Sequence, residues 1–139
     1  MDDIKEILSA HQGKNKRDAA IQGRQNRPLP SVSEIPDLFF DEILPKFKLN
    51  RAEICLLMIL YREVWCRPNL YEKYGIGPIN SLTEISKSME VSTDILLHSI
   101  QTLESFGFIE TIRSGQYFVR KYFTQENDHK YGQSYDNFL

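Results

Sequence analysis

The chain has 139 residues, 41% of them apolar, and a formal net charge of −2. These values predict one folded domain around a single core and exclude a wholly disordered chain. No apolar run approaches the roughly 18 residues that a bilayer span needs, and the amino terminus is acidic where a secretory signal is basic. We therefore expect a cytoplasmic protein without a membrane segment.

Residues 1–32 are predicted to be a flexible basic arm and linker. Residues 1–30 carry six basic and four acidic side chains, a net charge of +2, whereas residues 31–139 carry eleven basic and fifteen acidic ones, a net charge of −4. Pro28 and Pro30 favour extended backbone before the folded part begins. The basic side chains concentrated in this arm are Lys14, Lys16, Arg17, Arg24 and Arg27.

Two helices are expected between residues 33 and 66. Ser33 suits a helix N-terminus, and Pro45 is predicted to end the first helix. Asn50 followed three residues later by Glu53 is a capping-box pattern, which opens the longest expected helix. The apolar residues of that helix recur at helical spacing and are expected to face the core: Ile54, Leu57, Met58, Tyr61 and Trp65.

Two shorter helices are expected further along the chain. A short strand at residues 79–80 precedes the first of them, which Ser81 and Glu84 open with a second capping-box pattern. Ser92 caps the next helix, and Gly107 is a typical C-terminal stop.

A β-hairpin is expected after these helices. Residues 108–113 and 116–124 are rich in strand-forming side chains, and Ser114 and Gly115 between them suit a two-residue turn. Residues 125–139 are polar and are predicted to form a loosely held tail. The expected fold class is therefore α+β, mainly helical with a small hairpin.

The segment from Ile79 to Tyr122 resembles a winged helix-turn-helix domain. The matching residues are those of the short strand and helix, the turn, and the third helix that leads into the hairpin: Ile79 to Ile85, Val91 to Thr93, and Leu96, Ile100, Leu103, Gly107, Phe108 and Ile109. With Ile35 to Phe40 and the long helix, residues 33–124 look similar to the amino-terminal domains of phage and plasmid replication initiators and to the related module of DnaD-type primosomal proteins. The resemblance implies a DNA-binding protein in replication initiation or its control. It leaves transcriptional regulation open.

In a DNA-binding winged helix, the outward face of the third helix lies at the major groove. At about 100° per residue, that face carries His98, Gln101 and Thr102, which are expected to contact bases or phosphates. The hairpin is expected to hold phosphates through Arg113, Arg120 and Lys121. The arm residues Lys14, Lys16, Arg17, Arg24 and Arg27 either add phosphate contacts along double-stranded DNA or form a solubilising leader.

The alternative function is a protein-interaction module. Ile95 and Leu97 lie on the two shoulders of the apolar stripe of the third helix. They either pack into the core, which is the simpler interpretation, or form an exposed apolar patch that binds a replication protein or a second copy of the chain. Winged helices also serve as dimerisation and docking surfaces. A module of this kind would bind little DNA.

The loop after the long helix interleaves aromatic and basic residues, a composition that can stack bases. These residues are Arg67, Tyr71, Lys73 and Tyr74. We favour the simpler interpretation, in which the tyrosines cover the edge of the core.

The sequence gives little support for catalysis or metal binding. Cys55 and Cys66 fall in one expected helix, where a rise of about 1.5 Å per residue separates them by roughly 16 Å, too far for a disulfide. Neither has a histidine at a spacing that would activate it as a nucleophile, and the three histidines are scattered. We expect a protein that is not an enzyme and that needs no metal or cofactor.

Overall fold

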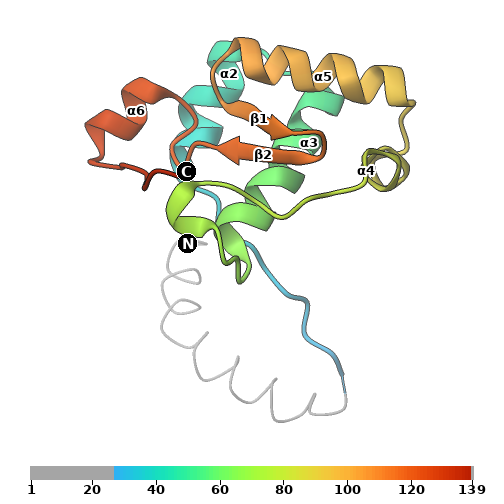
Figure 1. Cartoon of the computed structure of the whole chain (residues 1–139), viewed down its shortest axis with the longest axis horizontal. Coiled ribbons are helices and arrows are strands. Elements are labelled where there is room, and N and C mark those ends of the chain that lie inside the picture. The colour runs from blue at the N-terminus through green and yellow to red at the C-terminus, as the bar shows by residue number, and fades with distance from the viewer. Residues whose placement is uncertain (1–26, 139) are drawn as a thin grey trace, which may run out of the picture. The chain divides into compact units, whose positions relative to one another are not determined.

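The computed structural model describes residues 27–138. The chain divides into two compact units between Val32 and Ser33, and the elements below belong to the unit that begins at Ser33. These elements are helices and one small antiparallel sheet, so the α+β class predicted from the sequence is confirmed (Figure 1).

The first helical segment comprises the π-helical turn η1 (Phe39–Ile43) and helix α2 (Leu44–Phe47). The sequence predicts that the helix ends at Pro45, but it continues for two more residues. Pro45 lies at the start of α2, and the helical backbone runs into it without a break from η1, where the N–H of Leu44 donates to the carbonyl of Phe39. The segment ends at Lys48, whose φ of 51° is left-handed.

Helix α3 (Arg51–Tyr61) continues into the π-helical turn η2 (Arg62–Cys66). The predicted capping box at its start is confirmed, because the Asn50 side chain accepts from the N–H of Glu53 at 2.8 Å and the Glu53 side chain accepts from the N–H of Asn50 at 2.9 Å. The helix buries one face in the core, with Leu56, Leu57, Leu60, Tyr61 and Val64 almost inaccessible to solvent.

Helices α4 (Leu82–Met89) and α5 (Thr93–Ser105) form the expected pair. The Ser81 hydroxyl accepts from the N–H of Glu84, and the Ser92 hydroxyl accepts from the N–H of Ile95. Between the two helices, Glu90 takes a left-handed conformation with φ 57°. Helix α5 packs against both α3 and α4.

Strands β1 (Ile109–Arg113) and β2 (Gln116–Val119) pair antiparallel, as predicted for a hairpin. The segment 75–80 runs along the other edge of β2, where Ile76 lies opposite Phe118. Gly77 donates its N–H to the carbonyl of Tyr117 at 3.1 Å. This pairing begins earlier in the chain than the strand expected at residues 79–80.

Strand β2 is shorter than the run 116–124 predicts, because the chain turns away after Val119. The carboxylate of Asp128 accepts from the N–H of Tyr122 at 3.0 Å, and Phe123 takes a positive φ of 75°. Residues predicted to form a loosely held tail instead contain helix α6 (Gln125–Lys130). Asp128 is itself buried, and its hydrogen bond with the N–H of Tyr122 connects α6 to the end of the strand.

One hydrophobic core joins the helical segments to the inner face of the sheet. Its largest fully buried side chains include Phe39, Tyr61, Phe108 and Phe123. Phe123 stacks on Tyr61 with ring centroids 5.0 Å apart. Within residues 27–138, no helix combines the length and apolar character needed to cross a bilayer.

Candidate nucleic-acid interface

The outward face of α5 is open to solvent along much of its length. His98 and Gln101 are exposed, and Thr102 is half-buried. The Thr102 hydroxyl donates to the carbonyl of His98 at 3.1 Å, which satisfies its own donor but leaves its oxygen able to accept. The three side chains predicted to face DNA therefore lie on one accessible or partly accessible helix face.

The same helix exposes two large apolar side chains. Ile95 is 48% exposed and Leu97 is 43% exposed, so neither packs into the core as the simpler interpretation predicts. The buried stripe of α5 instead consists of Leu96, Ser99, Ile100 and Leu103. The exposed surface of α5 is thus a mixture of neutral polar and apolar groups.

The charge on α5 is unfavourable for DNA. The helix carries Asp94 in its first turn and no lysine or arginine. A carboxylate at that position stabilises the helix by its interaction with the positive end of the helix dipole, but it repels phosphate. The predicted phosphate contacts therefore require cations from segments outside α5.

Arg120 is held inside the protein by an acid. Its Nη1 lies 3.2 Å from the Asp128 carboxylate, with 23% and 4% of the two side chains exposed. Its Nε donates to the carbonyl of Gly107 at 3.1 Å, and its guanidinium carbon lies 5.2 Å from the centroid of the Phe118 ring. Arg120 is therefore a structural residue here, and its predicted role at phosphate is weakened.

Sequence reasoning missed this ion pair because Asp128 falls in the segment predicted to be loose. Asp128 also accepts from the Tyr135 hydroxyl at 2.6 Å. The pKa of Tyr135 is raised well above its usual value, mainly by burial and secondly by this hydrogen bond to a carboxylate. A helix-capping threonine before the segment, Thr124, was a local signal that α6 would form.

The other two hairpin cations are differently placed. Lys121 Nζ lies 5.5 Å from the centroid of Trp65 and 5.9 Å from that of Tyr122, in cation–π contacts that leave it partly exposed. Arg113 is exposed at the end of β1 and forms no ion pair with any residue from 27 to 138. Of the three predicted hairpin contacts, Arg113 is thus the most available for phosphate.

The tip of the hairpin is attached to the segment that precedes α4. Asn80 donates its N–H to the carbonyl of Gly115 at 2.7 Å, and its side-chain amide donates to Glu63 at 2.9 Å. Gly115 has a φ of 84°, and a Cβ there would collide with the carbonyl oxygen of Asn80. These contacts connect the hairpin turn, through Asn80, to Glu63 at the end of the long helix.

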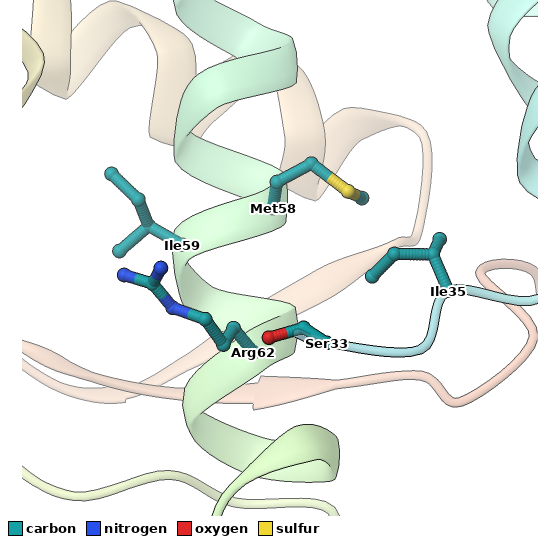
Figure 2. A pocket seen from close by; sticks show the side chains of 5 residues that line it. All are labelled: Ser33, Ile35, Met58, Ile59 and Arg62. Carbon is teal, nitrogen blue, oxygen red and sulfur yellow. The ribbon is translucent and has the colours of Figure 1, made fainter. Parts of the chain in front are cut away.

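One hollow of this part of the chain is lined by apolar side chains, a serine and an arginine. Figure 2 shows this hollow, of about 240 Å³, between the segment 33–35 and α3, where the guanidinium of Arg62 points away from Ser33 and toward Ile59. Its other lining side chains are Ile35 and Met58, so it contains no carboxylate, histidine or cysteine.

Chemistry at the two cysteines is also limited. Both are free thiols, and burial raises the pKa of Cys66, which lowers the fraction of reactive thiolate. Among the residues that the structure covers, no group of three or more potential metal-binding side chains occurs.

No protein-family model matches the chain, and neither the curated proteins nor the solved structures include one that is detectably similar to it. Four of the predicted arm contacts, Lys14, Lys16, Arg17 and Arg24, lie outside the described residues. Arg27 is described and exposed. The functional argument therefore depends on the geometry above.

Proposed function

We propose that the chain is a cytoplasmic winged helix-turn-helix protein that binds double-stranded DNA and is not an enzyme. The observation that supports this most strongly is the accessible face of α5, where His98 and Gln101 project from the second helix of a tightly capped helical pair. A recognition helix needs such a face to reach base edges.

The order of elements also supports the winged-helix assignment. Helix α3 is followed by the segment 75–80 against β2, then by α4, α5 and the hairpin (Figure 1). This is the order in the replication-initiator domains that residues 33–124 resemble. A role in replication initiation or its control follows from that resemblance, and transcriptional regulation uses the same geometry.

The proposed division of labour differs from the simplest winged-helix scheme. Arg120 is paired with Asp128, so we assign phosphate binding chiefly to Arg113 and to the basic arm, with a smaller part for Lys121. The folded part carries a net charge of −4, so the arm has to supply most of the electrostatic attraction. Base contacts come from His98, Gln101 and Thr102.

The test is duplex binding measured by fluorescence anisotropy over a range of salt concentrations. We expect deletion of residues 1–26 to weaken binding and to reduce the salt slope by about 0.9 for every phosphate that the shortened chain no longer neutralises. In selections from a randomised duplex pool, Gln101→Ala should relax the preference at the base it contacts, at a cost of about 1–3 kcal/mol. The matched control is Ser105→Ala, an exposed change at the end of α5. Absence of duplex binding by the intact chain at low salt would refute the proposal.

A second candidate function is protein interaction through α5. The exposure of Ile95 and Leu97 favours it, because each leaves a large apolar side chain open to a partner, one on either side of the buried stripe of α5. The partner would be a second copy of the chain or a replication protein. This candidate does not need the basic arm, which distinguishes it from DNA binding.

A further inference from the structure

Six aromatic side chains outside α4 and α5 form two groups of neighbouring rings. They come from the end of η2, the loop that follows it, strand β2 and the C-terminal segment (Figure 1). We call this set the aromatic surface, and its members are Trp65, Tyr71, Tyr74, Phe118, Tyr135 and Phe138.

The aromatic surface consists of two groups of rings in contact. Tyr135 contacts both Phe118 and Trp65, with ring centroids 4.8 Å and 6.2 Å away. Phe138 contacts Tyr74 at 5.5 Å and Tyr71 at 6.2 Å. Gly75 follows Tyr74 of the second group directly in the chain and lies against the first group, because a Cβ there would be 2.8 Å from a Phe118 ring atom and 3.0 Å from a Tyr135 ring atom.

Within the described part of the chain, five of the six residues are half-buried, and Tyr71 is 39% exposed. The core aromatics behave differently, since Phe39, Tyr61, Phe108 and Phe123 are buried. The loop tyrosines Tyr71 and Tyr74 are exposed and half-buried, as side chains at the edge of the core can be. Together with Phe138 and Trp65 they present ring surface to solvent.

Cations lie over these rings. Lys73 Nζ is 5.2 Å from the centroid of Tyr74, and Lys121 Nζ is 5.5 Å from that of Trp65. Arg67 is exposed in the same loop. The acids Glu72 and Asp136 flank them, so the local charge is only slightly positive, although the surrounding domain is acidic.

Hydrogen bonds hold the surface in shape. The N–H of Asp136 donates to the carbonyl of Lys73 at 3.0 Å, and the N–H of Lys121 donates to the Tyr135 hydroxyl at 2.9 Å. In the loop, Asn69 donates through its side chain to the carbonyl of Ile76 at 2.7 Å. A surface fixed in this way loses little conformational entropy when a ligand binds.

We propose that the aromatic surface binds single-stranded nucleic acid. Unpaired bases stack on exposed ring surface around Tyr71, and phosphates lie near Lys73 and Lys121. Partly exposed rings interleaved with cations are the chemistry that single strands require, and the low net charge makes stacking the larger contribution. The inference extends the proposed DNA binding to a second site that uses none of the side chains of α5.

Trp65 provides the readout, because it is the single tryptophan of the chain and lies within the surface. We expect an oligothymidylate of about 12 nucleotides, within the usual site size for single-strand binding, to quench its fluorescence saturably. The salt slope should be shallow, about 0.7 for each phosphate contacted.

Two variants test the assignment. Tyr71→Ala should weaken oligothymidylate binding about 5- to 100-fold, and Lys73→Ala should reduce the salt slope by about 0.7. The matched control is Lys46→Ala, because Lys46 Nζ also lies near a ring, 5.8 Å from the centroid of Phe47, but outside the aromatic surface. Circular dichroism spectra of the variants should match that of the intact chain, which checks that each variant is folded.

The outcomes separate this inference from the proposed duplex binding. Oligothymidylate binding that survives Gln101→Ala but is weakened by Tyr71→Ala supports the inference, even if the intact chain fails to bind duplex. Absence of quenching at low salt would overturn it. Binding to Tyr71→Ala and Lys73→Ala that is as tight as to the intact chain would also overturn it, because the strand would then lie elsewhere.

Discussion

Asp128 shows how one side chain decides what another can do. Its carboxylate accepts from Arg120, from the N–H of Tyr122 and from the Tyr135 hydroxyl. A buried carboxylate is stable only when such partners satisfy it. The same contacts that stabilise Asp128 direct the charge of Arg120 inward, which is why the hairpin offers fewer cations to a ligand than its sequence suggests.

Arg120 and Arg113 therefore form a matched pair for a test of structural against binding roles. We expect Arg120→Gln to lower the free energy of unfolding by about 1–3 kcal/mol, because it leaves a buried carboxylate short of a partner. Its effect on duplex affinity should be small. Arg113→Gln should show the reverse, with unchanged stability and a salt slope reduced by about 0.9.

Urea unfolding and duplex titrations at several salt concentrations measure both quantities. If Arg120→Gln left stability unchanged and weakened duplex binding, Arg120 would be a phosphate contact, as its place in the hairpin sequence suggests.

At the level of elements, short-range caps determine where the helices begin. Asn50, Ser81 and Ser92 each accept from a backbone N–H three residues later. The hairpin turn has a local signal in Gly115, but it is also held by Asn80, a residue far away in the chain. The angle between the hairpin and the helices thus depends on a tertiary contact.

Glycine substitutions distinguish the turn from its tertiary contact. Gly115 and Gly107 both have positive φ, at 84° and 81°, so alanine is strained at either position. Only at Gly115 would the new Cβ meet another atom, the carbonyl oxygen of Asn80, whereas nothing lies within 4 Å of one at Gly107.

We expect Gly115→Ala to lower the free energy of unfolding by at least about 1 kcal/mol more than Gly107→Ala does. Chemical denaturation of the two variants measures the difference. Equal decreases would mean that the contact between Asn80 and the turn contributes nothing.

At the scale of the whole molecule, charge and apolar surface are separated along the chain. Residues 1–30 have a net positive charge, whereas residues 31–139 have a net negative charge and expose apolar side chains on α5. The proposed DNA binding depends on the first feature, whereas the second candidate function, self-association, depends on the second. Measuring the oligomeric state therefore tests the second candidate function without reference to DNA.

If α5 mediates self-association, light scattering should give a dimer or a larger species at micromolar concentration. Leu97→Asp should then yield monomers with an unchanged circular dichroism spectrum, because the side chain is already 43% exposed and a charge there is compatible with the fold. The matched control is Ser114→Asp, which places the same charge at an exposed polar position in the hairpin turn, outside α5. A native chain that remains monomeric rules out self-association and leaves only a different protein as partner.

The sequence by itself determined the elements whose signals are local. The helix after Asn50, the pair opened by Ser81 and Ser92, and the turn at Gly115 could be placed because capping and turn preferences act over a few residues. The α+β class followed from their order. The candidate recognition face of α5 could also be predicted, because helical periodicity alone separates Gln101 from Leu103.

Only the tertiary structure decided which of the candidate site residues are available. The pairing of Arg120 with Asp128, the position of Lys121 over Trp65 and the contact of the C-terminal segment with the loop at Tyr71 all join different elements. Sequence patterns carry no information on such contacts, since they depend on how the elements pack. The exposure of Ile95 and Leu97 was settled in the same way, because a helix face is buried only where another element covers it.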